Sequence, residues 1–288
     1  MTGAIDCHVH VQPWTQLKPG ARAAFEKGHA GFAELERLVS DPASFAAYLD
    51  GEGIAAAALI NYPSPVMGFD ASVNDFVAGY RDRRPERFLA FGGVHPPSTA
   101  RLDAEMDRLL DRLRLDGVKI HPPHQGFAAN AYLDSLPDLR TVYARCEAAG
   151  VPVMIHTGTS IFPGARSRLG EPMAVDDVAV DFPGLKILLA HGGRPLWSEA
   201  AFFLMRRHRN CWLDLSGVPP KRILDYFPRL AEVEDRVLFG TDWPSPGVPG
   251  IGENLRAFLS LPLPEPTKRK IARENALRLF PRLAGKAA

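Results

Sequence analysis

The sequence predicts an α/β fold, a (β/α)8 barrel of the TIM type, formed by a single domain over residues 1–288. Three observations predict it: eight apolar segments alternate with helical segments, composition does not shift between the two halves, and histidines fall where apolar segments end. An open doubly wound sheet usually carries a glycine-rich phosphate loop after its first strand, but here residues 8–13 read His-Val-His-Val-Gln-Pro. The barrel is therefore preferred.

The first strand, at residues 3–11, carries two histidines one residue apart. In an extended strand alternate side chains share a face, so we expect Asp6, His8 and His10 to point one way and Cys7 the other. Two imidazoles at this spacing can bind one divalent metal. Asp6 is either a partner that supports the ligands or a polar filler of the barrel, and Cys7 is expected in the core against the helices.

The next elements follow from local signals. Residues 12–40 form an insertion rich in proline, glycine and charge, predicted as a loop with one short helix at 32–38. Asp41 followed by proline is typical of a helix start and predicts a helix to Gly51. Apolar runs predict the further strands at 54–62, 88–95, 117–121, 151–156, 185–191, 211–216 and 236–242.

The remaining helices lie between these strands. Leucine and methionine at helical spacing predict a helix over 99–114, and Gly150 is the expected end of another. Two helices close the chain, at about 254–280. The predicted helices after the first are 72–83, 99–114, 138–149, 174–181, 196–207, 220–230, 254–261 and 267–280.

Composition excludes several classes of function. Lys and Arg number 34 and Asp and Glu 33, and this balance of +1 does not predict a nucleic-acid partner. The longest uncharged run, residues 53–69, is broken by proline and glycine, so no membrane segment is expected. Three cysteines without a Cys-x-x-Cys pair favour a reducing compartment, and the start of the sequence shows no signal peptide. We expect a cytoplasmic protein with a small-molecule substrate.

Polar side chains recur at the carboxyl ends of the predicted strands, which surround the catalytic mouth of such a barrel. Neutral imidazoles with one carboxylate are the ligand set of a catalytic zinc, which we expect first, or of manganese, iron or nickel. Such a metal lowers the pKa of a bound water to roughly 7. The residues at these ends are His8, His10, His95, Lys119, His121, His156, His191 and Asp242.

These motifs resemble the amidohydrolase superfamily, and in particular its amidohydrolase-related branch, which includes aminocarboxymuconate-semialdehyde decarboxylase and related lactonases and hydrolases. The resemblance extends from Ile5 to about Phe280. The motifs that carry it are His8-x-His10, His156 in Met-Ile-His-Thr-Gly, His191 in Leu-Ala-His-Gly-Gly, and Asp242 in Phe-Gly-Thr-Asp-Trp-Pro.

The resemblance implies a metal held by His8, His10, His156 and Asp242. It also implies that Asp242 shuttles a proton, and that His191 orients or polarises the substrate or binds a second ion. Related barrels commonly pair, so a homodimer is possible.

Lys119 is the least settled position. In two-metal members of the superfamily a lysine on strand four is carbamylated and bridges the ions, whereas decarboxylase-like members use one metal and need no such lysine. We favour one ion over two. Lys119 would then be an ammonium group that holds a substrate carboxylate.

Other residues are candidates for substrate binding, and each has a simpler explanation. His95 and His121 precede prolines and could simply end their strands, while Trp243 could pack beneath a loop. Arg194 could clamp a substrate carboxylate or be solvated. The segment 157–168 suits a loop over the site. The other histidines, at positions 29, 124 and 208, are expected to be solvated.

We expect a metal-dependent hydrolase in which metal-bound hydroxide attacks an amide, lactone or ester carbonyl, with Asp242 as base and then acid. The alternative is a metal-dependent decarboxylase that releases carbon dioxide without oxidation, assisted by His191 or Asp242. A third class is a metal-binding barrel without catalytic activity. The first two share a ligand set, and loops determine the difference.

Overall fold

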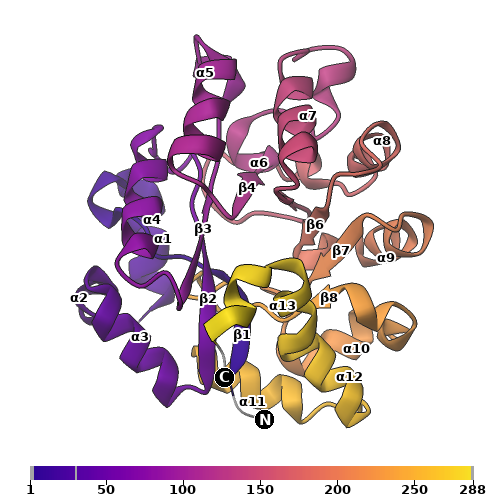
Figure 1. Cartoon of the computed structure of the whole chain (residues 1–288). Helices are drawn as coiled ribbons and strands as arrows, with labels where there is room; N and C mark the ends of the chain where they lie inside the picture. Colours follow the sequence, from indigo (N-terminus) through magenta and orange to yellow (C-terminus); the bar gives the residue numbers. More distant parts are fainter. Residues whose placement is uncertain (1–2, 30, 287–288) are drawn as a thin grey trace.

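The structure of the chain is a computed structural model that describes residues 3–29 and 31–286. Its eight strands form one parallel sheet in chain order, which confirms the predicted TIM barrel (Figure 1). The outer limits of the predicted domain, residues 1 and 288, lie outside the described residues. The strands are β1 (Ala4–Val9), β2 (Ile54–Ile60), β3 (Phe88–Gly92), β4 (Gly117–Ile120), β5 (Val153–His156), β6 (Ile187–Ala190), β7 (Cys211–Asp214) and β8 (Val237–Leu238).

Backbone hydrogen bonds between β1 and the segment after β8 close the barrel. Asp242 N donates to His8 O at 2.8 Å, and His10 N donates to Trp243 O at the same distance. Two segments more than 230 residues apart are thereby joined at the carboxyl ends of the strands.

Helices surround the strands (Figure 1). They are α1 (Pro19–Gly28), α2 (Phe32–Ser40), α3 (Pro42–Gly51), α4 (Ser72–Asp82), α5 (Leu102–Asp107), α6 (Pro122–Gln125), α7 (Leu139–Ala149), α8 (Ala174–Asp181), α9 (Ser198–Arg207), α10 (Ile223–Tyr226), α11 (Ile251–Leu259), α12 (Glu265–Arg269) and α13 (Asn275–Leu279).

The insertion at 12–40 contains α1 and α2 where one helix was predicted. Its proline-rich composition suggested a loop, but Pro19 lies in the first turn of α1, where proline is tolerated. Phe25 of α1 packs edge-on against Trp14, with ring centroids 5.2 Å apart. This burial stabilises a short helix that local propensity alone would not.

Several predicted elements are shorter or broken in the structure. In place of the predicted helix 99–114, the structure has α5 followed by a π-helical segment, Arg108–Arg112. A second π-helical segment, Lys270–Glu274, joins α12 to α13. Of the predicted helix 220–230, only α10 is α-helical in the structure. The eighth strand stops at Leu238, and Asp242 has φ 68°, which an extended strand does not adopt.

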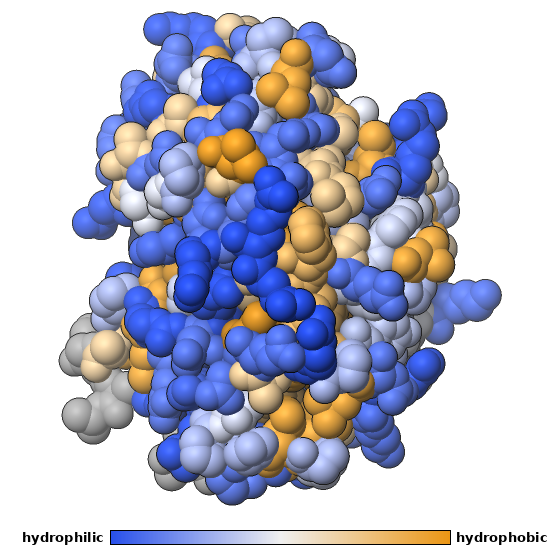
Figure 2. Space-filling model, turned by 90° about the vertical axis from the view of Figure 1, so that its right-hand side faces the viewer, coloured by the Kyte–Doolittle hydropathy of each residue, from blue (hydrophilic) through white to orange (hydrophobic). Residues whose placement is uncertain are grey.

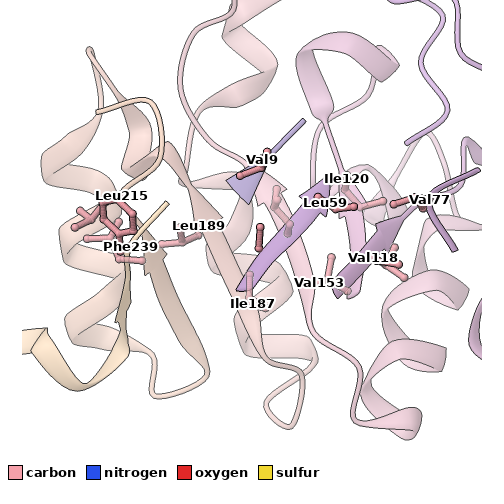
Figure 3. Close-up of a cluster of buried hydrophobic side chains, with 14 of the residues drawn as sticks. Val9, Leu59, Val77, Val118, Ile120, Val153, Ile187, Leu189, Leu215 and Phe239 are labelled. Carbon is pink, nitrogen blue, oxygen red and sulfur yellow. The ribbon is translucent and has the colours of Figure 1, made fainter. Parts of the chain in front are cut away.

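The apolar core has two layers. The larger layer lies between the strands and the outer helices, and includes Leu59, Val118 and Val153 (Figure 3). The smaller layer fills the barrel interior, where Met154 and Leu188 are fully buried. It extends to α13 and to Phe280, whose ring lies 5.9 Å from that of Phe91. The amino-terminal end of the barrel is therefore closed by apolar side chains.

Strand β1 does not alternate as predicted. Its register shifts between Asp6 and Val9. Cys7 joins the apolar layer inside the barrel instead of facing the helices, and the Asp6 carboxylate accepts hydrogen bonds from Thr241 Oγ1 (2.7 Å) and Thr241 N (3.0 Å). A bulge redirects side chains in this way. Asp6 thus fastens β1 to the segment after β8.

None of the helices in the described part of the chain has the length and apolar character that a membrane crossing requires. On the face seen in Figure 2, hydrophobic residues form separate patches between hydrophilic ones. Phe203 on α9 and Val180 on α8 are examples of exposed apolar side chains.

Candidate metal centre and cavity

Three buried side chains of the types that bind metals meet at the carboxyl ends of the strands. His8 lies in β1, His191 directly follows β6, and Asp242 follows β8. One potential ligand atom from each lies within 4.8 Å of the others. None of the three residues is more than 5 % exposed. The cluster has the composition and compactness of a site for one divalent cation.

Asp214 of β7 determines which nitrogen of His8 faces the cluster. Nδ1 of His8 lies 2.6 Å from Oδ2 of Asp214. When the Asp214 carboxylate is ionised it only accepts hydrogen bonds, so in that state Nδ1 carries the proton and Nε2 presents its lone pair to the cavity. Within the described residues Nε2 forms no hydrogen bond. It is available to a metal.

Ser216 connects His191 to the same carboxylate. Nδ1 of His191 donates to the carbonyl oxygen of Ser216 at 2.9 Å. The Ser216 hydroxyl donates to Oδ2 of Asp214 at 2.7 Å. Since Nδ1 of His191 carries the proton, its Nε2 also presents a lone pair. Burial raises the pKa of Asp214, and the hydrogen bonds from Ser216 oppose that shift.

The backbone at His191 and Asp242 is strained. Both have φ 68°, the left-handed region that residues other than glycine rarely adopt. Such a conformation costs about 1–3 kcal/mol and persists where the surroundings enforce it. The hydrogen bond from Asp242 N to His8 O is one such restraint. Both side chains line the cavity.

Two further predicted ligands lie beside the cluster. Nε2 of His10 is 3.1 Å from Oδ1 of Asp242. The His156 ring centroid is 4.6 Å from that of His191, and neither ring nitrogen of His156 has a hydrogen-bond partner in the part of the chain that is described. The structure therefore brings all four predicted ligands together with His191. Their ligand roles stay a prediction.

A divalent metal fits these residues. A buried nitrogen without a hydrogen bond costs about 1–3 kcal/mol, and an ion would satisfy several at once. Burial lowers the pKa of His8, His156 and His191 well below 6.5, so their imidazoles are neutral, as metal binding requires. Nitrogen and carboxylate oxygen donors suit zinc, manganese or iron.

Two cations approach the cluster. Lys119 of β4 is 1 % exposed and lines the cavity, and its Nζ makes no hydrogen bond to any described residue. Burial lowers the pKa of Lys119, against the nearby charges of Asp214 and Asp242. Nη2 of Arg194 lies 3.5 Å from Oδ2 of Asp242. Both groups can hold an anionic substrate.

Asp242 and Asp6 differ in pKa although both are buried. Burial raises the pKa of Asp242, but the hydrogen bond with His10 and the positive charge of Arg194 are among the effects that lower it to about 2. Burial raises the pKa of Asp6 to about 7, despite its hydrogen bonds with Thr241 and His8. Asp242 is therefore the stable carboxylate of the site.

Stacked rings form the wall on the β4 and β5 side. His121 stacks between His124 (3.6 Å between centroids) and His156 (3.8 Å). The prediction that His124 is solvated is wrong, because this side chain is 3 % exposed. Pro122 and Pro123 begin the one-turn helix α6, which folds His124 back over the strand end. His29 and His208 are partly buried as well.

These walls enclose a cavity of about 370 Å³. The loop predicted to cover the site contributes residues 159–162 to its lining. The predicted site residues that line it are His8, His10, Lys119, His121, His156, His191, Arg194 and Asp242.

Two predicted substrate contacts are not brought to this cavity. Trp243 is buried and stacks on Phe45 and Tyr48, with centroids 5.8 and 5.9 Å away. Nδ1 of His95 is hydrogen-bonded to Ser98 Oγ (2.8 Å), and the residue lines a different surface pocket. The simpler explanation for each, packing and strand ending, accounts for its position.

Sequence reasoning missed Asp214, Ser216 and Tyr62. Asp214 and Ser216 lie at the carboxyl end of the seventh predicted strand and Tyr62 ends the second. The rule that polar residues at strand ends face the mouth, applied to every strand, would have found them.

A family model described as Amidohydrolase matches residues 5–282. Curated relatives include the gamma-resorcylate decarboxylase of Rhizobium sp., 26% identical over 250 residues, which are 72% of this chain and 74% of that protein. The 6-methylsalicylic acid decarboxylase of Penicillium expansum is 27% identical over 248 residues, 74% of this chain and 75% of that one.

Solved structures share the fold. An uncharacterised TIM-barrel protein of Bordetella bronchiseptica has a TM-score of 0.78 at 24% identity, over 98% of this chain and 99% of that chain. A 5-carboxyvanillate decarboxylase of Novosphingobium aromaticivorans, solved with manganese and a nitrobenzoic acid, has a TM-score of 0.73 at 17% identity, over 97% of each chain.

These comparisons correct one prediction and confirm another. The expected hydrolase is wrong, because the named relatives are decarboxylases and therefore favour the alternative. The resemblance drawn from the motifs at His8, His156, His191 and Asp242 is confirmed. Since the family model spans nearly the whole sequence, the chain belongs to the amidohydrolase family.

Proposed function

We propose that the protein is a metal-dependent decarboxylase that removes the carboxyl group of a hydroxylated aromatic acid without oxidation. The observation that carries this proposal is the cavity in which Lys119 and Arg194 approach the cluster around Asp242. A cavity of about 370 Å³ accommodates a single aromatic ring. The relatives, which act on gamma-resorcylate and 6-methylsalicylic acid by name, support this substrate class.

Manganese is the ion we propose in place of the zinc first expected. Decarboxylases from Novosphingobium aromaticivorans and Polaromonas sp. were both solved with manganese. His8, His10, His156 and Asp242 would hold one ion together with His191, whose ligand atom lies within 4.8 Å of those of His8 and Asp242. When bound, the ion supplies a Lewis acid that polarises a substrate oxygen.

Asp242 is the residue we propose to move the proton. Its carboxylate takes the proton of a ring hydroxyl and delivers it to the ring carbon that bears the carboxyl group. The bond between that carbon and the carboxyl group then breaks, its electron pair returns to the ring, and carbon dioxide leaves. The ring oxygen recovers a proton from water, so each turnover consumes one proton.

The neighbouring residues hold the reacting groups in place. Arg194 and Lys119 bind the substrate carboxylate as cations, while the Asp214 and Ser216 hydrogen bonds keep His8 and His191 in the tautomers described above. The stacked histidines line one wall of the cavity.

The test is a substrate screen of the manganese-loaded protein with hydroxybenzoates, lactones and amides. We expect carbon dioxide in equal amount to the acid consumed, loss of turnover on chelation, and recovery with Mn²⁺. Parallel samples loaded with zinc, iron or nickel test the metal. Turnover of a lactone or amide without carbon dioxide would overturn the proposal.

A further inference from the structure

We propose that Tyr62, supported by His124 and Ser160, donates a hydrogen bond to an oxygen substituent on the ring of the substrate. The inference rests on the proposed function. It assigns to Tyr62 the selection of hydroxylated acids over acids that lack that hydroxyl.

Tyr62 is buried at the wall of the cavity. It follows β2, is 3 % exposed and lines the cavity. Its Oη lies 2.9 Å from Nδ1 of His124, and Nε2 of His124 lies 2.7 Å from Oγ of Ser160. The three side chains form one hydrogen-bonded chain from the barrel wall to the loop over the cavity.

The chain can run in two directions because the imidazole is neutral. Burial lowers the pKa of His124 to about 3, so one ring nitrogen donates and the other accepts. If Tyr62 donates to Nδ1, its hydroxyl proton is engaged by His124 and is not available to a ligand in the cavity. If Nδ1 donates to Tyr62 Oη, Nε2 accepts from Ser160 and the Tyr62 proton is available to the cavity.

The surroundings of Ser160 are compatible with the second direction. Phe162 N donates to Ser160 Oγ at 3.3 Å, so this oxygen already accepts one hydrogen bond and its proton can go to His124. Burial raises the pKa of Tyr62 well above 10, so its hydroxyl remains a donor. A substrate oxygen that accepts from Tyr62 therefore stabilises a polarised chain.

The Tyr62 ring is fixed relative to the candidate metal centre. It stacks on His121 at 5.1 Å, and His121 stacks on His156 at 3.8 Å. The donor thus lies on the β2 and β4 side, whereas the His8, His191 and Asp242 cluster lies on β1, β6 and β8. A ring acid with two oxygen substituents can meet both sides at once. Polar groups built for a hydroxyl discriminate strongly against ligands that lack it.

The experiment compares Tyr62→Phe with the wild type, both loaded with manganese. Two ligands that differ by one hydroxyl, 2-nitroresorcinol and 2-nitrophenol, are titrated by calorimetry; the first is an inhibitor bound in the Polaromonas decarboxylase structure. We expect the wild type to prefer 2-nitroresorcinol by roughly tenfold to a hundredfold, the cost of leaving a buried donor without its acceptor when the second hydroxyl is missing. Tyr62→Phe should lose this preference.

Tyr80→Phe is the matched control. This tyrosine on α4 is also buried, lies outside the cavity, and has no hydrogen bond from its hydroxyl among the described residues. Tyr80→Phe should keep the preference for 2-nitroresorcinol. His124→Phe, which retains the stacked ring, should lose this preference. KM values for 2,6-dihydroxybenzoate and 2-hydroxybenzoate should show the same pattern as the Kd values.

The outcomes separate the two proposals. If Tyr62→Phe raises the Kd of both ligands equally, or keeps the preference for 2-nitroresorcinol, Tyr62 has no role in hydroxyl selection. If the wild type shows the Tyr62-dependent preference but releases no carbon dioxide from either acid, the hydroxyl subsite is supported and the proposed decarboxylation is wrong.

Discussion

The two ends of the barrel interior are built from the same strands but differ in chemistry. On β5, Met154 belongs to the apolar layer and His156, two residues later on the same face, belongs to the cavity wall. On β7, Trp212 and Asp214 show the same change. His156 is 4 % exposed and Met154 0 %. Position along the strand, not burial, thus separates residues of the fold from residues of the site.

The two ends also differ energetically. Each large apolar side chain at the amino-terminal end contributes about 1.5–3 kcal/mol to folding by leaving water. The carboxyl end instead contains strained residues, His191 and Asp242, and histidine nitrogens that lack hydrogen bonds within the described chain. Substitutions at the two ends should therefore separate stability from activity.

The largest expected effect is on activity, from Asp242→Asn. The amide cannot carry the proton that the proposed reaction moves, so we expect kcat for hydroxybenzoate decarboxylation to fall about 10²- to 10⁴-fold. The measurement is carbon dioxide release at saturating Mn²⁺, with a Mn²⁺ titration of the variant to separate lost metal from lost proton transfer. A variant that retains both metal and full turnover would show that the proton takes another route.

Met154→Ala tests the apolar end. A methionine-to-alanine change in a packed interior costs about 2–5 kcal/mol in the free energy of unfolding, because it removes contacts and leaves a cavity. Urea unfolding measures the loss, and kcat of the folded variant should not change. The matched variant His156→Ala, on the same strand face, should lose activity with a smaller loss of stability. Similar losses of stability and activity in both variants would contradict the division between the two ends.

Asp214→Asn tests the support behind the ligands. The asparagine amide has no negative charge with which to accept the hydrogen bond from Nδ1 of His8. In the wild type this nitrogen lies 2.6 Å from Oδ2 of Asp214. We expect Mn²⁺ affinity to fall about 10- to 100-fold, the usual effect of removing such a partner. Competition with a chelating dye measures it without reference to turnover. Unchanged affinity would mean that the His8 tautomer is fixed without Asp214.

Much of this arrangement could be predicted from sequence because it depends on periodic signals. Apolar runs and helix ends gave eight strands in the right order, and polar residues at the ends of those strands gave the cavity wall. Asp214, at the carboxyl end of β7, follows the same rule.

Other features depend on packing that no local pattern records. Cys7 was placed on the wrong face because a bulge in β1 breaks the alternation on which that prediction relied. His124 was expected in solvent, yet stacking on His121 buries it. Helix α1 is stabilised by the contact of Phe25 with Trp14. The type of reaction was wrong for a different reason: the same ligand set serves hydrolysis and decarboxylation.

The smallest expected effect comes from Arg194→Lys, which changes how the cavity holds the acid without removing the charge. Lysine cannot form the two parallel hydrogen bonds of a guanidinium, so we expect KM for the acid to rise roughly tenfold, equivalent to one lost hydrogen bond of about 1.4 kcal/mol. Mn²⁺ affinity should not change. Arg166→Lys is the control, because Arg166 is exposed and does not line the cavity. A fall in kcat with KM unchanged would instead mean that Arg194 acts on Asp242, whose Oδ2 lies 3.5 Å from its Nη2.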